Sequence, residues 1–164
     1  MTRPDGRYTR PLVSDTHHYF AYASLLDPER LTAVAPGARF RFIAHFPETR
    51  LVFSIAGDHG RLASLESEAG NTVWGGVFEI PSIELEALSA VEATQGRKPG
   101  WPEKAVDRAG NKWDVIAFTA AQPLAEEAPP DREELAAAIR GARYWNLPAG
   151  WVLGLEDLGE GVDL

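Results

Sequence analysis

The stretch Thr72–Ala93, TVWGGVFEIPSIELEALSAVEA, predicts a strand, a tight joint and a helix in succession. Its first half is rich in aromatic and branched apolar residues, which is typical of a largely buried strand. Gly75 and Gly76 in the middle of that strand indicate either a close approach to the backbone or a sharp bend. Pro81 ends the strand, and Ser82 is the expected N-cap of the helix.

The helix predicted after this joint carries a carboxylate, Glu92, near its far end. Apolar residues spaced by three or four form one face of the helix, namely Ile83, Ala87, Leu88 and Val91. Glu92 follows Leu88 by four residues, so it lies beside this face rather than opposite it. A carboxylate at the edge of an apolar face is a candidate for a raised pKa and acid/base chemistry. The alternative is a solvated glutamate at a helix end.

Composition limits the class of protein. The chain has 164 residues, of which 45% are apolar and 24% charged, as expected for a soluble globular domain with a real core. The net charge of -8 argues against nucleic acid and anionic membranes as partners. There is no cysteine, which excludes a thiol nucleophile, a disulfide and a cysteine-ligated metal. No apolar run could act as a signal peptide or cross a membrane, so we expect a cytoplasmic protein.

The pattern along the chain predicts one domain of short strands and helices. We expect a loosely held arm over residues 1–16, a single domain over 17–158 and an acidic tail over 159–164. A connection over residues 56–72 is long enough to be functional or mobile. Strands are predicted over residues 18–22, 38–46 and 51–55, with a hairpin over 103–120. Helices are predicted after Asp27-Pro28, over about 131–143, and through Trp151 to Leu155.

The segment Tyr22–Leu25 lies between a strand end and a helix start, where backbone N–H groups commonly hold an anion. Ser24 is either a ligand-binding hydroxyl or a cap at the strand end. Tyr22 is either a core aromatic or a pocket residue. Trp101, in a Gly/Pro-rich loop, either forms the wall of a pocket or anchors that loop. The histidines lack a third ligand at metal spacing, so we expect no metal site.

Several stretches, taken together and in order, resemble the gamma-glutamylcyclotransferase family. Tyr19–Leu26, YFAYASLL, stands in the place of the family's opening strand and its Tyr-Gly-Ser-Asn or Tyr-Gly-Ser-Leu loop. Val73-Trp74-Gly75 matches the family's Val-Trp-Gly strand, and Leu88–Ala93 resembles the helix end that bears its catalytic glutamate. Pro130–Pro148 resembles its C-terminal helices. The likeness covers about residues 17–158, and the ordered set is far more specific than any single motif.

This resemblance implies an α+β fold, with a small mixed β-barrel of five or six strands flanked by helices. It implies an enzyme that cyclises a gamma-glutamyl amine, amino acid or peptide to 5-oxoproline and releases the amine, without a cofactor. Glu92 would be the acid/base. The substrate, a small molecule with a gamma-glutamyl or similar group, would contact the loop residues Tyr22, Ala23, Ser24 and Leu25, with Trp101 in the place of a pocket tyrosine.

The chain departs from the family pattern at the pocket. Ala23 replaces the loop glycine, which would cost on the order of 1–2 kcal/mol if that backbone needs a positive φ. Leu25 replaces the asparagine of the main branch, Ala93 replaces the glycine after the glutamate, and Glu134 stands where the family has a tyrosine. These departures leave two other hypotheses open, a non-catalytic domain that binds a small ligand and an oligomerising accessory protein. The sequence predicts no particular oligomeric state.

Overall fold

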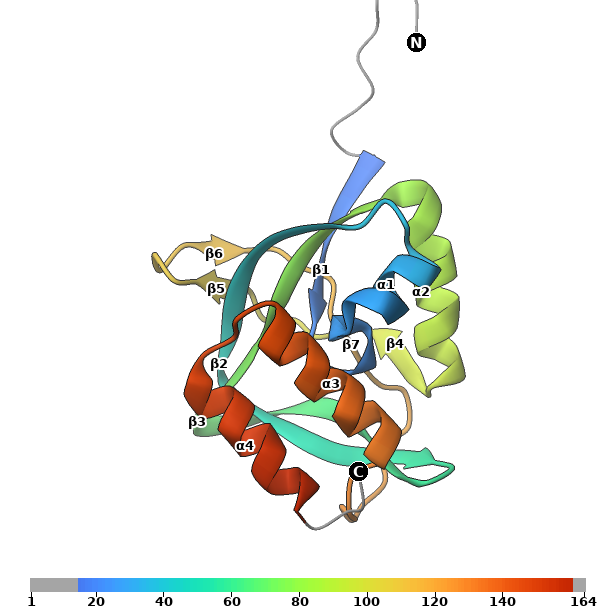
Figure 1. Cartoon of the computed structure of the whole chain (residues 1–164), viewed down its shortest axis with the longest axis vertical. Coiled ribbons are helices and arrows are strands. Elements are labelled where there is room, and N and C mark those ends of the chain that lie inside the picture. The colour runs from blue at the N-terminus through green and yellow to red at the C-terminus, as the bar shows by residue number, and fades with distance from the viewer. Residues whose placement is uncertain (1–14, 161–164) are drawn as a thin grey trace, which may run out of the picture.

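The computed structural model describes residues 15–160, which form two antiparallel sheets with helices packed around them (Figure 1). In chain order the elements are β1 (Thr16–Ala21), the 3-10 helix η2 (Ser24–Leu26), α1 (Pro28–Val34), β2 (Arg39–Gly57), β3 (Gly60–Pro81), α2 (Ser82–Thr94), β4 (Arg97–Pro99), β5 (Ala105–Asp107), β6 (Lys112–Trp113), β7 (Phe118–Ala120), α3 (Arg132–Tyr144) and α4 (Ala149–Gly159). The expected arm and acidic tail lie mostly outside the described residues.

The larger sheet has the strand order β1-β3-β2-β5-β6, and a second sheet pairs β4 with β7. All these ladders are antiparallel, and parallel pairing occurs in isolated bridges such as Tyr19 with Ile116. Figure 1 shows β2 and β3 as long curved strands with α3 and α4 in front of them. Between residues 15 and 160 no ladder joins β6 back to β1, so the sheet is open and only loosely a barrel. The expected α+β class is confirmed.

Gly75 allows β1 to lie directly against β3. A Cβ atom at this position would collide with the carbonyl oxygen of Ala21 and would lie 2.7 Å from the ring of Phe20. Since real Cβ atoms are not found so close to backbone, a side chain here would force the two strands apart. The close approach expected from the Gly75-Gly76 pair is therefore confirmed.

The two faces of β1 belong to two different apolar clusters. Tyr19 packs into a cluster with residues of α2, α3 and α4, whereas Phe20 packs among Phe46, Val73 and Val77. Consecutive side chains of a strand point to opposite faces, which explains this division. Tyr19 therefore points to the side of the sheet on which α2 carries Glu92.

The expectation of two short strands and a long connection over residues 38–72 is wrong. Residues 39–57 form the single strand β2, and residues 60–81 form β3, so the supposed connection is a hairpin. The register shifts between Pro47 and Thr49, and Glu48 takes a positive φ of 54°. This irregularity accommodates the proline without ending the strand. Residues 66–72 are polar because they are exposed, not because they leave the sheet.

Helix α2 also differs in detail from the prediction. Its N-cap is Pro81 rather than Ser82, and no side chain caps the helix. The expected apolar face is wrong at its start, since Ile83 is 87% exposed and Ala87 is exposed as well. Because the helix packs mainly through its second half, its fully buried residues are Leu88 and Glu92. These two lie one turn apart on the same face.

The other helix starts follow the sequence signals. The Asp27 side chain accepts a hydrogen bond from the Glu29 N–H at 3.1 Å, and Pro28 occupies the first helical position of α1. Asp131 caps α3 through the N–H groups of Glu133 and Glu134. The chain therefore enters α3 at a fixed place, and this fixes the position of Glu134 in the first turn.

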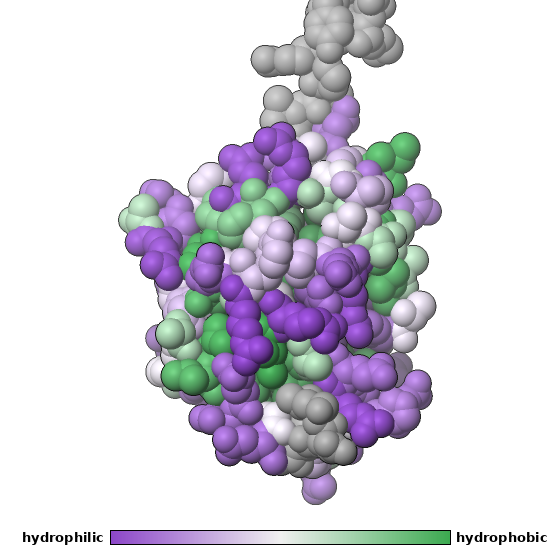
Figure 2. All heavy atoms as spheres, viewed as in Figure 1, coloured by the Kyte–Doolittle hydropathy of each residue, from purple (hydrophilic) through white to green (hydrophobic). Residues whose placement is uncertain are grey.

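The surface shown in Figure 2 is mostly hydrophilic, with apolar side chains gathered at the lower left and along the right edge. The large apolar residues that are exposed include Leu153 on α4 and Ile83 on α2. Among residues 15–160, no helix combines the length and the hydrophobicity needed to cross a membrane.

Candidate active site

Glu92 lies at the buried end of α2, with 4% of its surface exposed. Its Oε2 accepts a hydrogen bond from the Tyr19 hydroxyl at 3.1 Å, and its Oε1 pairs with Arg97 Nη1 at 3.2 Å. The prediction of a solvated glutamate is therefore wrong. Both carboxylate oxygens have a partner, and each keeps a second acceptor position for a further donor.

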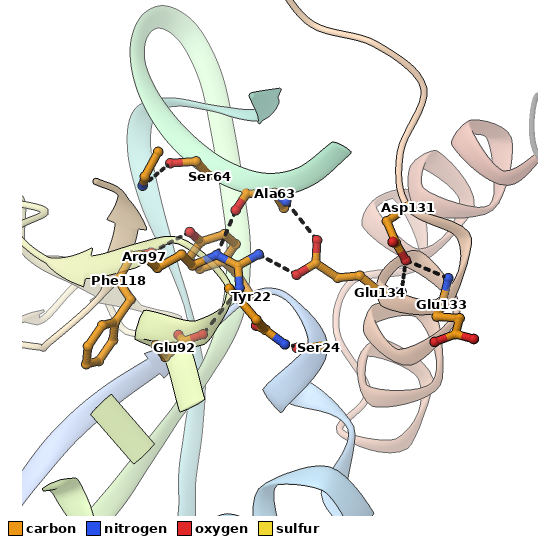
Figure 3. A network of polar contacts seen from close by, with 12 residues as sticks. Tyr22, Ser24, Ala63, Ser64, Glu92, Arg97, Phe118, Asp131, Glu133 and Glu134 are labelled. Atoms are coloured by element: carbon orange, nitrogen blue, oxygen red, sulfur yellow. Dashed lines mark hydrogen bonds and ion pairs between the residues drawn. The ribbon is translucent and has the colours of Figure 1, made fainter. Parts of the chain in front are cut away.

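Arg97 is the centre of the polar network drawn in Figure 3. It lies on β4, only 2% exposed, five residues after Glu92. Its Nε donates to the Ala63 carbonyl at 2.8 Å, and its Nη1 donates to Gln95 Oε1 at 2.7 Å as well as to Glu92. Its Nη2 donates to Glu134 Oε1 through a very short contact. One guanidinium thus joins two buried carboxylates, as its planar set of donors allows.

Glu134 reaches this network from the first turn of α3 and is 4% exposed. Its second oxygen, Oε2, accepts the backbone N–H of Ala63 on β3 at 2.7 Å. Glu134 therefore does not complete a capping box with Asp131, although the sequence spacing fits one. Its side chain instead ties the helix to the sheet.

Opposing influences act on the pKa of Glu92. Burial raises the pKa of the Glu92 carboxyl, while Arg97 and the Tyr19 hydroxyl act in the opposite direction because they stabilise the charged form. Burial also raises the pKa of Tyr19 well above its ordinary value, and the adjacent charge of Glu92 adds to this. Tyr19 thus stays protonated as a donor, and Glu92 is the group whose protonation can change.

The loop Tyr22–Leu25 lies beside this network, and its side chains take different roles. The Ser24 hydroxyl is buried and donates to Gln95 Oε1 at 3.4 Å, so Gln95 connects the loop to Arg97. The Tyr22 hydroxyl donates to the Phe118 carbonyl at 2.5 Å. Leu25 packs into the apolar core, away from the polar groups.

Ala23 adopts a negative φ of −124°, so the substitution for glycine carries no left-handed strain. The residue lines a small cavity of about 10 Å³ beside the network, together with Tyr22, Ala63 and Glu134. The remaining walls of this cavity are apolar and come from Leu51, Phe53, Leu135, Ala138 and Leu155. The cavity is about the size of one water molecule.

The structure thus brings Glu92, Ser24, Tyr22 and Ala23 to one region. Trp101 is partly buried and packs edge-on against Phe46, with ring centroids 6.1 Å apart, in the cluster on the other side of β1. No contact between Trp101 and Glu92 is found among the described residues. In the same part of the chain, no group of three His, Cys, Asp or Glu side chains could hold a metal ion.

Sequence reasoning did not identify Tyr19, Gln95 and Arg97 as site residues, and it noted Glu134 as a capping-box partner of Asp131 and as a departure from a family pattern. One signal pointed to Arg97. A glutamate on the apolar face of a helix needs a cation when it is buried, and Arg97 is the nearest arginine along the chain. Glu134 carried no such signal, because its partners come from distant elements.

Comparisons with known proteins support the fold. Neither a family model nor a curated protein matches the chain. Among solved structures, a gamma-glutamyl cyclotransferase superposes with a TM-score of 0.76 at 23% identity over 86% of each chain. An uncharacterized human protein gives a TM-score of 0.76 at 24% identity over 87% of each chain. YkqA from Bacillus subtilis gives 0.75 at 22% identity, over 90% of this chain and 55% of that one.

At these identities the likeness establishes the fold. The chain has the α+β fold of gamma-glutamyl cyclotransferase, as the ordered sequence motifs indicated.

Proposed function

We propose that this chain cyclises a gamma-glutamyl group to 5-oxoproline, with Glu92 as the general acid/base. The observation that carries the proposal is the position of Glu92. It is a buried carboxyl with a raised pKa, and it is connected through Arg97 and Gln95 to Ser24 in the loop. A buried, perturbed carboxyl beside a loop of this kind is the arrangement that proton transfer to a bound ligand requires.

In the proposed reaction, the Glu92 carboxylate takes a proton from the alpha-ammonium of the substrate. The freed amine attacks the gamma-carbonyl carbon of the same molecule and forms the C–N bond of the five-membered ring. The bond from that carbon to the leaving nitrogen then breaks as Glu92 gives its proton to that nitrogen. The ring nitrogen passes its second proton to Glu92, which releases it with the departing amine, so that a neutral lactam and an ammonium product result. Because both reacting groups belong to one molecule, the protein mainly has to orient the chain and move the proton.

Arg97 and Tyr19 have a supporting role in this proposal. Both stabilise the ionised form of Glu92, so the base remains available although the site is buried. Backbone N–H groups of the loop Tyr22–Leu25 would hold the substrate carboxylate or the developing oxyanion. In this proposal the substrate contacts the loop residues and one aromatic side chain, namely Tyr22, Ala23, Ser24, Leu25 and Trp101.

The test is release of 5-oxoproline from a panel of gamma-glutamyl amino acids, gamma-glutamyl amines and glutathione. Glu92→Gln should abolish release, since the amide keeps the size of the side chain but cannot take up the proton. Glu86→Gln is the matched control, because Glu86 is exposed on the same helix and should leave the rate unchanged. Equal release by wild type and Glu92→Gln, or no release by either on any substrate, would refute the assignment.

A second candidate function is a non-catalytic domain that binds a small ligand. It is motivated by the altered loop, in which Ala23 stands in place of glycine and its methyl group lines the cavity beside the polar network. This alternative predicts thermal stabilisation by a gamma-glutamyl compound without turnover. Ala23→Gly would enlarge the cavity, so appearance of 5-oxoproline in that variant alone would identify a degenerate enzyme.

A further inference from the structure

The carboxylate of Glu134 is held as a bound ligand would be. Arg97 Nη2 donates to Oε1, and the backbone N–H of Ala63 donates to Oε2 at 2.7 Å. Two donors on one side, each directed at a different oxygen, form the arrangement by which proteins bind free carboxylates. The donors belong to the sheets, whereas the carboxylate comes from α3.

A small cavity lies next to the carboxylate of Glu134. The cavity of about 10 Å³ is lined by Glu134 itself, by Ala63 and by Tyr22 and Ala23 of the loop. Figure 3 shows Glu134 reaching from α3 toward Arg97, so that its carboxylate lies between the helix and the guanidinium. If the Glu134 side chain turned away, the donors and the cavity would join into one hollow beside the loop.

We propose that Arg97 and the Ala63 N–H form a binding site for the carboxylate of a small ligand, and that Glu134 fills this site when no ligand is bound. An exchange of carboxylates leaves the charge around Arg97 unchanged and keeps its contact with Glu92. The guanidinium of Arg97 would then lie between the carboxylate of the ligand and that of Glu92. As a statement about substrate, this inference rests on the proposed function, since gamma-glutamyl compounds carry carboxylates.

The site can be tested by emptying it. Glu134→Ala removes a fragment with the composition of acetate, so added acetate should refill the space between Arg97 and Ala63. We expect the melting temperature of Glu134→Ala to rise by about 3–6 °C for each tenfold increase in acetate above its Kd. Glu134→Gln is the matched control, because its amide still fills the space, and it should respond no more to acetate than wild type does. Chloride at equal ionic strength and neutral acetamide should not replace acetate.

Each outcome decides the question. A rise specific to acetate and to Glu134→Ala supports the site. The same response in all three proteins, a response to acetamide, or a Glu134→Ala variant that fails to fold at every acetate concentration overturns it.

A second measurement tests displacement of Glu134 in a chain that keeps the Glu134 side chain. The Ala63 amide resonance is followed while Glu92→Gln, which should not turn over substrate, is titrated with gamma-glutamylalanine or gamma-glutamylethylamide. A saturable shift with both ligands assigns the site to the glutamyl carboxylate. A shift with gamma-glutamylalanine alone assigns it to the carboxylate of the released amino acid. No shift with either ligand refutes displacement. Binding with no 5-oxoproline from wild type would refute the proposed function and leave the carboxylate site standing.

Discussion

Replacing Arg97 by methionine tests whether the buried network holds this fold together. The arginine side chain has no exposed surface, and it serves four acceptors, those of Glu92, Glu134, Gln95 and Ala63. Methionine fills a similar volume but leaves two buried carboxylates without a cation. Breaking a buried ion pair in this way costs about 3–5 kcal/mol, which corresponds to a fall of about 6–20 °C in melting temperature.

The size of this loss should depend on pH. In Arg97→Met the carboxyl of Glu92 stays buried without the cation that opposes the effect of burial, so its folded pKa rises further above its unfolded value of about 4.3. A group with a raised folded pKa contributes its full stability below the unfolded pKa and loses it as the pH rises through the folded pKa. The difference in unfolding free energy between wild type and Arg97→Met should therefore be small near about pH 4 and largest at neutral pH.

Urea unfolding of wild type and Arg97→Met across this pH range measures this difference directly. Arg143→Met is the control, because Arg143 is 59% exposed in its ion pair with Glu156 and should cost less than about 1 kcal/mol. A loss of unfolding free energy for Arg97→Met as small as that of the control, or one that does not change with pH, would show that Arg97 does not compensate the buried carboxylates.

Two further substitutions test the surroundings of the site. Tyr19→Phe removes the hydroxyl donated to Glu92, so stability should fall by about 0.5–1.5 kcal/mol and the pKa of Glu92 should rise further, because the lost bond favours the charged form. Carboxyl NMR titration checks this, and an unchanged Glu92 titration contradicts it. Gly75→Ala should cost about 1–3 kcal/mol in chemical unfolding, since its methyl group meets the carbonyl of Ala21. Gly100→Ala, where nothing lies within 4 Å, is the control, and equal losses would refute the steric argument.

The sequence predicted those features that depend on neighbours along the chain. Asp27 and Asp131 cap their helices because each acts on N–H groups two or three residues away. A hairpin was also predicted over residues 103–120, and in its turn Gly110 takes the positive φ of 88° that a tight turn often needs. The spacing of Glu92 to Leu88, again a local relation, indicated a position beside the apolar face but left a solvated glutamate open as the alternative.

The sequence could not predict features that depend on tertiary packing. Pro47 indicated the end of a strand, yet pairing with β3 on both sides of it keeps β2 continuous through the irregularity at Glu48. Glu134 bonds Ala63 across 71 residues and Arg97 across 37, so no local pattern could place the three together. The core of the candidate site is therefore a property of how α3 packs on the sheets.

This packing also explains why the pocket departs from the family pattern in more than one place. The resemblance puts a tyrosine where this chain has Glu134, and a buried carboxylate is unfavourable by several kcal/mol unless a cation and hydrogen bonds compensate it. Arg97 supplies the cation, and the Ala63 N–H supplies the hydrogen bond. Each of the two side chains compensates the charge of the other at a buried position, so Glu134 and Arg97 are energetically coupled. This pair therefore places a second carboxylate beside Arg97 while Glu92 stays buried and hydrogen-bonded.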